Sequence, residues 1–187
     1  MTVLTVYDLT KGREPQAATR DEREILKALL PFDVRYERWE ASKPLAPGAG
    51  QDAVLETYRR DVDRLIKIGG YQSVDVVRMH PEHPDRDAMR QKFLSEHKHA
   101  DDEVRFFVEG AGAFYLRNDN QVLKVVCEQG DLLSVPKYTR HWFDMGPRPL
   151  FAAIRLFTTP DGWVAEFTGD KIADTIPGYD SGAKHAA

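Results

Sequence analysis

Two histidines one residue apart, with a glutamate four positions after the second, are the residues of this chain best suited to chemistry. They are His97, His99 and Glu103. Side chains of a β-strand alternate between its two faces, so an extended segment would place all three on the same side. On a helix, the two histidines would instead lie about 200° apart. Two imidazoles and one carboxylate on one face are ligands for a divalent transition metal, so the stretch predicts a metal-binding strand.

A third histidine can complete this group from a later part of the chain. His141 follows a turn at Gly130-Asp131, an apolar strand and the strand-breaking Pro136. In an antiparallel barrel, His141 would lie on a strand that faces the first one. Three histidines and one glutamate would occupy four positions of an octahedron. Two adjacent positions would remain for a bidentate ligand, or for substrate and water.

The remaining histidines have a simpler interpretation. His80, His83 and His185 are interpreted as surface residues or as core residues whose polar atoms have partners, because an isolated histidine is usually one or the other. The same interpretation fits His97 and His99 poorly. Burying both beside a carboxylate, without a metal, would leave polar groups in need of partners.

The sequence around the two histidines predicts a β-rich C-terminal half. Turn-like sequences such as Glu109-Gly110 and Asn118-Asp119-Asn120 separate short apolar runs. The strands expected from these runs are 103–108, 112–117, 121–127, 131–135, 141–144, 150–157 and 163–167. Several short strands at this spacing predict a sandwich or a barrel.

The N-terminal half mixes helix and strand patterns. Thr19 to Glu22 forms a capping-box signature before a helix that Pro31 ends. The other expected elements are strands over 1–8, 32–36 and 75–77 and helices over 51–68 and 85–94. We expect one domain, residues 1–187. In it, residues 1–94 pack on a barrel core, residues 95–168, that carries the metal site, and residues 175–187 form a coil tail.

Composition narrows the class of protein. The chain has 187 residues, 42% of them apolar and 30% charged, as in globular proteins with a real core. A net charge of −4 argues against a nucleic-acid partner, and no stretch has the length or apolarity of a membrane span or a signal peptide. Cys127, taken as a core residue, is the only cysteine and fits a reducing compartment. We therefore expect a cytoplasmic protein.

The spacing of the candidate ligands resembles the two motifs of the cupin superfamily. The first motif is His-x-His, three residues, Glu, six residues and Gly, and Gly110 completes it here; Gly130, Pro136 and His141 match the second. The chain departs from the motifs at Gln91, Tyr138 and Met145, which affect turn geometry and not ligation. This resemblance implies a mainly β fold, the cupin double-stranded β-helix or jelly-roll barrel, with additional N-terminal α-helices.

A more specific resemblance covers most of the chain. The segments 97–106 and 139–146 are similar to those of the acireductone dioxygenase family of methionine salvage, as are residues 71–94, 154–157 and 162–163. The resemblance implies metal-dependent cleavage of 1,2-dihydroxy-3-keto-5-methylthiopentene (acireductone) by O₂. It implies one Fe²⁺ or Ni²⁺ ion per chain and a monomer. With iron the products would be formate and 4-methylthio-2-oxobutanoate; with nickel they would be formate, carbon monoxide and 3-(methylthio)propanoate. The ligand types do not choose between the two metals.

Arg105 is the candidate catalytic residue. Its odd number places it on the same strand face as Glu103, and its guanidinium stays protonated, so its expected role is to stabilise the dianion of the substrate. The alternative is a surface arginine in a salt bridge. Glu96 and Asp102 match family positions thought to affect metal incorporation. Both are even-numbered and would point away from the metal, and a solvated surface acid is the alternative for each.

Three aromatic residues are candidates for the substrate pocket. Phe93, Phe143 and Trp163 match family aromatics that would line the methylthio end of the substrate, although each could simply belong to the core. Two alternatives to the acireductone reaction remain open. One is another cupin dioxygenase or isomerase that acts on a different small molecule. The other is a non-enzymatic cupin that binds a ligand or a metal.

Overall fold

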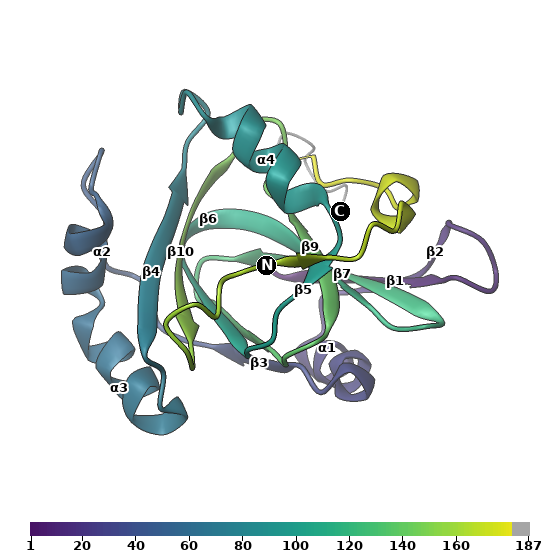
Figure 1. Cartoon of the computed structure of the whole chain (residues 1–187), viewed down its shortest axis with the longest axis horizontal. Helices are drawn as coiled ribbons and strands as arrows, with labels where there is room; N and C mark the ends of the chain where they lie inside the picture. Colours follow the sequence, from purple (N-terminus) through teal and green to yellow (C-terminus); the bar gives the residue numbers. More distant parts are fainter. Residues whose placement is uncertain (181–187) are drawn as a thin grey trace.

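Strands make up most of the regular structure, as the sequence predicts. A computed structural model describes residues 1–180. Its strands are β1 (Val3–Asp8), β2 (Pro15–Thr19), β3 (Arg35–Arg38), β4 (Ser73–Met79), β5 (His97–Lys98), β6 (Glu103–Arg117), β7 (Gln121–Glu128), β8 (Asp131–Val135), β9 (Arg140–Asp144), β10 (Leu150–Phe157) and β11 (Glu166–Phe167). Its helices are α1 (Glu22–Leu29), α2 (Gln51–Thr57), α3 (Arg59–Gly69) and α4 (Arg86–Leu94), with 3₁₀ turns at Leu30–Phe32 and Ile172–Thr175. The strands form one eleven-stranded antiparallel sheet (Figure 1).

β6 connects the two layers of this sheet. Its first half pairs with β10 and β8, and its second half pairs with β7 and β9. β4 extends the first layer beyond β10, and β1 extends the second layer beyond β7. The inner faces of the two layers share one hydrophobic core, to which Phe107 and Phe151 belong from one layer and Phe114 and Phe143 from the other. The expected mainly β fold with helices in the N-terminal half is confirmed.

The predicted turn at Glu109-Gly110 is wrong, because β6 passes through it without a break. Ala152 of β10 pairs with Glu109, whereas Ala153 pairs with Phe107, so β6 carries one extra residue between them. Such a β-bulge bends a strand without ending it. Gly110 has a φ of +61°, and a side chain there would collide with the carbonyl group of Leu150. The glycine therefore allows a bend and a close strand contact.

The bulge changes which residue numbers face the inner core. Before the bulge, the odd-numbered Phe107 lies in the inner core and the even-numbered Phe106 in an outer one; after it, the even-numbered Phe114 lies inside and the odd-numbered Tyr115 outside. An extra residue shifts a pattern of period two by one position. The parity argument for Glu103 and Arg105 consequently holds only because both precede the bulge.

Helices cover the outer face of the first layer. Figure 1 shows α2 and α3 along the outside of β4, where they share a second hydrophobic cluster with β6 and β10. A single helix over residues 51–68 is the wrong prediction for this region, because the backbone of Tyr58 leaves the helical conformation. The single O–H of the buried Tyr58 is shared between the carbonyl oxygens of Ala41 and Lys43, which lie 3.1 and 2.8 Å from the hydroxyl oxygen.

Local interactions shift the boundaries of other N-terminal elements. Asp21, and not Thr19, caps α1, because its carboxylate accepts hydrogen bonds from the N–H groups of Arg23 and Glu24. The strand expected over 32–36 begins only at Arg35, after the 3₁₀ turn and the left-handed Asp33. β2 has no counterpart among the predicted strands, because its residues are mostly exposed and lack apolar alternation.

The C-terminal segment packs more closely than expected. The strand predicted over 163–167 is reduced to β11. Residues 176–180 have no regular secondary structure, as expected for a coil, but Ile176 and Tyr179 are buried against the outer face of the second layer. The rest of the expected tail, including His185, lies outside the described residues. Among the helices of residues 1–180, none has the length and apolarity needed to cross a membrane.

Candidate metal centre

The structure brings the three predicted histidines together. β5 pairs with β9 so that His97 lies directly opposite His141. His99 joins them, and one ring nitrogen from each of the three lies within 4.8 Å of the other two. All three side chains are buried. Among the described residues, no other group of three such side chains has this arrangement.

The chain between His97 and Glu103 is not the single strand that the sequence predicts. β5 ends at Lys98, and β6 begins at Glu103 with different neighbours. In the connecting segment, the carbonyl of His99 accepts a hydrogen bond from the N–H of Tyr138, at 2.7 Å. The side chains still converge, although two separate strands and a bend hold them.

Main-chain carbonyl groups fix the orientation of the imidazole rings. Nδ1 of His97 lies 2.7 Å from the carbonyl oxygen of Ser95, and Nδ1 of His141 lies 2.8 Å from that of Thr139. Nδ1 of His99 lies 3.3 Å from the carbonyl oxygen of Val164. A carbonyl oxygen only accepts, so each Nδ1 carries the proton and each Nε2 keeps a free lone pair. This tautomer is the one that ligates a metal through Nε2.

Burial favours the neutral form that a metal requires. Burial, with the nearby His141, lowers the pKa of His97 to about 3. Nε2 of His141 is buried and has no hydrogen-bond partner among the described residues. An unpaired buried nitrogen of this kind costs free energy unless something binds it. The donor set therefore fits a divalent transition metal.

Glu103 borders the three histidines. Its Oε2 lies 3.2 Å from Nε2 of His99 and 3.7 Å from Nε2 of His141. Its Oε1 accepts hydrogen bonds from Arg105, 2.6 Å from Nη2 and 3.1 Å from Nε. Burial alone would raise the pKa of the Glu103 carboxyl, but the Arg105 guanidinium beside it holds that pKa well below its usual range.

Arg105 is buried, so its alternative interpretation as a surface arginine is wrong, although it does form a salt bridge. The guanidinium carbon lies 4.5 Å from the ring centre of Phe114 and 4.8 Å from that of Phe143. Burial lowers the pKa of Arg105, while the Glu103 carboxylate acts in the opposite direction. The aromatic rings and the carboxylate hold the guanidinium in one place beside the three histidines.

A cavity of about 320 Å³ opens beside these residues. Phe93, Phe143 and Trp163, the predicted pocket aromatics, all line it. The other lining residues are Asp75, Val77, Met89, Lys92, His97, His99, Arg105, His141, Arg155, Ala165 and Phe167. Asp75 and Arg155 are absent from the predicted site. In the sequence, each could have been noticed as a charged residue with an odd number inside an otherwise apolar strand.

Glu96 and Asp102 lie outside the group of three histidines, but their surroundings differ. Glu96 is buried, so its alternative interpretation as a solvated surface acid is wrong. Its carboxylate accepts hydrogen bonds from Arg117 and from the hydroxyl of Thr168. Asp102 is exposed and accepts a hydrogen bond from the N–H of Lys137, at 2.8 Å. Each joins the segment near His97 and His99 to a later part of the chain.

Asp101 is a further structural residue that the sequence did not single out. Its buried carboxylate accepts hydrogen bonds from the hydroxyl groups of Thr158 and Thr159 and from the N–H of Thr159. A side chain at Gly162 would collide with this carboxylate. Asp101 therefore anchors the loop that carries Trp163 and the carbonyl group facing His99.

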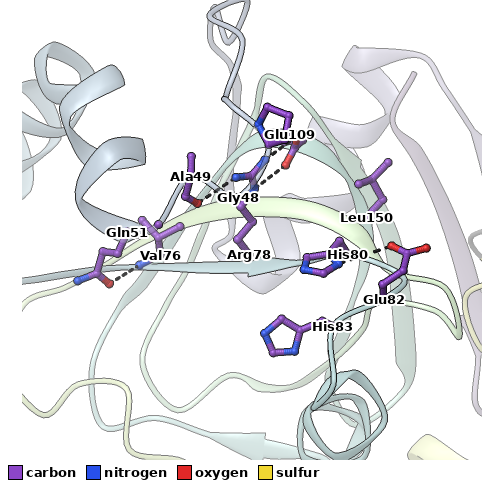
Figure 2. Close-up of a pocket in the computed structure, with 12 residues that line it drawn as sticks. Gly48, Ala49, Gln51, Val76, Arg78, His80, Glu82, His83, Glu109 and Leu150 are labelled. Carbon is purple, nitrogen blue, oxygen red and sulfur yellow. Dashed lines mark hydrogen bonds and ion pairs between the residues drawn. The ribbon is translucent and has the colours of Figure 1, made fainter.

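A second, larger hollow lies away from the three histidines, and Figure 2 shows the residues that line it. Its volume is about 570 Å³, and His80 and His83 are among its lining residues. His80 is exposed, as predicted, and Nδ1 of the partly buried His83 accepts a hydrogen bond from the N–H of Asp85. Cys127 is buried in the inner core, also as predicted.

The fold and the three-histidine group define a metal-binding protein of the cupin class. The chain matches the ARD/ARD′ family over residues 3–165, and it belongs to this family of acireductone dioxygenases. It is 57% identical over 181 residues to acireductone dioxygenase of Parvibaculum lavamentivorans, covering 97% of this chain and 98% of that one. It is 49% identical to the Yersinia enterocolitica enzyme of the same name, covering 96% of this chain and all of that one.

A solved structure supports the same assignment. The chain resembles acireductone dioxygenase from Bacillus anthracis, which has a cadmium ion in its active centre. The TM-score is 0.76 at 30% identity, and the match covers 89% of this chain and 98% of that one. The expected cupin fold is therefore confirmed.

Proposed function

We propose that this protein cleaves acireductone with O₂ and that one Fe²⁺ or Ni²⁺ ion is held by His97, His99, Glu103 and His141. The observation that carries the proposal is the set of three buried, oriented imidazoles beside a carboxylate and a cavity. When bound, the ion supplies a Lewis acid and a template for the two adjacent oxygens of an enediol.

The protein's own residues would bind and polarise the substrate. Arg105 lies beside Glu103 and lines the cavity, so its positive charge favours the ionised enediol over the neutral one. Phe93, Phe143 and Trp163 provide an apolar wall for the methylthio end.

Product analysis tests this function. Purified protein would be loaded with Fe²⁺ or with Ni²⁺, mixed with acireductone without oxygen, and then exposed to O₂. We expect loss of the ultraviolet absorbance of the substrate with both metals. We expect 4-methylthio-2-oxobutanoate and formate with iron, and 3-(methylthio)propanoate, formate and carbon monoxide with nickel. Unchanged acireductone with both metals would favour a cupin that acts on another small molecule, or one that only binds it.

We also propose that the protein acts as a cytoplasmic monomer that binds neither nucleic acid nor membranes. The single buried cysteine and the net charge of −4 support this proposal. Light scattering of the purified protein would give its mass in solution, and a dimeric mass would contradict the monomer.

A further inference from the structure

Three charged side chains form a row across adjacent strands on the inner face of the first layer. Asp75 of β4 lies opposite Arg155 of β10, and Arg155 lies opposite Arg105 of β6. All three line the cavity beside the histidines. The row brings two arginines from different strands to the same wall.

Two like charges directly opposite each other in a sheet destabilise it, and burial strengthens the repulsion. Each guanidinium has one acidic neighbour that offsets this cost. Nε and Nη2 of Arg155 donate to the two oxygens of Asp75, at 2.8 and 2.6 Å, and Arg105 donates to Glu103. An arrangement that places two arginines together in a cavity is costly for the fold and well suited to an anion.

Both arginines keep donor capacity for a ligand. Within residues 1–180, neither Nη1 of Arg155 nor Nη1 of Arg105 donates a hydrogen bond. The two arginines balance Asp75 and Glu103 in charge. A divalent cation at the histidines would therefore leave an excess of two positive charges beside the cavity, apart from the exposed Lys92. That excess matches a dianion.

We propose that Arg155 is a second oxyanion-binding residue of this cavity, acting with Arg105 on a small anion that has an apolar end. In this proposal Asp75 competes with the ligand for the Arg155 guanidinium and so moderates its affinity. The proposal rests on the proposed function, because the enediolate of acireductone and the carboxylate of its products are anions of this type.

A comparable ion pair on the same strands provides a control. Arg78 of β4 pairs with Glu109 of β6 across β10, on the outer face of the layer (Figure 2). Nε and Nη2 of Arg78 donate to Glu109, and Nη1 donates to the carbonyl oxygens of Ala46 and Ala49. Every nitrogen of Arg78 therefore has a partner, and four of its five N–H donors are used, whereas Arg155 uses two of five.

Calorimetric titration of the Ni²⁺-loaded full chain with 3-(methylthio)propanoate tests the proposal. This probe carries one carboxylate and an apolar thioether end. We expect Arg155→Gln to weaken binding about tenfold or more, because a hydrogen bond to a charged group is worth roughly that factor. Asp75→Asn should tighten binding several-fold, because it frees donors of Arg155. Arg78→Gln should leave the dissociation constant unchanged.

The two variants are expected to change the affinity for the probe in opposite directions, and this distinguishes a ligand-binding role of Arg155 from a structural salt bridge. If the pair were purely structural, either substitution would destabilise the protein, and the probe would bind equally weakly to Arg155→Gln and Asp75→Asn. That result would overturn the proposal. Failure of the unaltered protein to bind the probe would also overturn it. If Arg155→Gln does not fold, Asp75→Asn and the charge-conserving Arg155→Lys still decide the question. Failure to cleave acireductone would remove the proposed function and leave this binding result standing.

Discussion

The cavity beside the three histidines (the inner cavity) and the larger hollow lined by His80 and His83 (the outer hollow) contain the same kinds of residues. They differ in how far the polar atoms of these residues already have hydrogen-bond partners. Each is lined by two or more histidines and by arginine near a carboxylate. In the outer hollow, Arg78 has a partner for every nitrogen, and His80 is exposed to solvent. In the inner cavity, His141 has a buried ring nitrogen without a partner among the described residues, although the inner cavity is the smaller of the two.

The difference shows that neither size nor residue type identifies the reactive site. Polar groups that are already paired stabilise the fold and have little capacity left for a ligand. Polar groups that are buried, oriented and unpaired cost stability, and a bound ion or substrate can offset that cost. Substitutions in the inner cavity should therefore affect binding and turnover, and matched substitutions in the outer hollow should not.

The largest effect is expected from His141. His141→Ala removes one of three imidazoles that we propose as metal ligands, whereas His80→Ala removes an exposed imidazole of the outer hollow. Loss of an outer-shell partner alone typically costs 10–100-fold in metal affinity, so loss of a ligand should cost at least roughly 100-fold. Competition with a chelator would measure the affinity, and elemental analysis the metal content. Equal affinities in the two variants would contradict the comparison.

Arg105 should show the next largest effect, on turnover and not on metal content. Removing one group that stabilises developing negative charge commonly costs about 10²–10³ in rate. We expect Arg105→Ala to retain metal and to lose turnover by this factor, and Arg78→Ala to retain both. Stopped-flow absorbance of acireductone would measure the rate. A metal-loaded Arg105→Ala variant with normal turnover would exclude the proposed role.

The sequence predicted His97, His99 and Glu103 because their pattern is local. They lie within seven positions of one another, so their side chains stay close although two strands, and not one, carry them. Arg105 followed from the same pattern because β6 keeps its register until the bulge. The predicted turn at Gly110 failed because glycine is compatible with both a turn and a bent strand.

Residues from other strands could not be grouped in the same way. Asp75 and Arg155 are eighty positions apart, and only the pairing of β4 with β10 and of β10 with β6 places them beside Arg105. Strand order is a property of the whole sheet, and short apolar runs do not specify it. The sequence showed that each charged residue interrupts an apolar run, but it did not show which residue on another strand is its partner.

Asp101 should have a smaller effect, because it acts on the cavity through a loop. Asp101→Asn weakens the anchor of the Thr158–Thr159 turn, which holds Trp163 in the cavity wall and the Val164 carbonyl near His99. We expect roughly tenfold weaker metal binding, the lower end of the range for residues that orient a ligand. The change should also increase quenching of Trp163 fluorescence by a soluble quencher.

The matched control for Asp101 lies in the same loop. Asp161 is exposed, and only its main-chain carbonyl, which accepts a hydrogen bond from the N–H of Val164, contributes to the loop. Asp161→Asn keeps that carbonyl and should leave metal affinity and fluorescence unchanged. If both variants lost metal equally, the charge of the loop would be responsible, and not the anchor. If neither variant lost metal, the His99 ring would be oriented without Asp101. The difference between the inner cavity and the outer hollow would then depend only on the residues that line them.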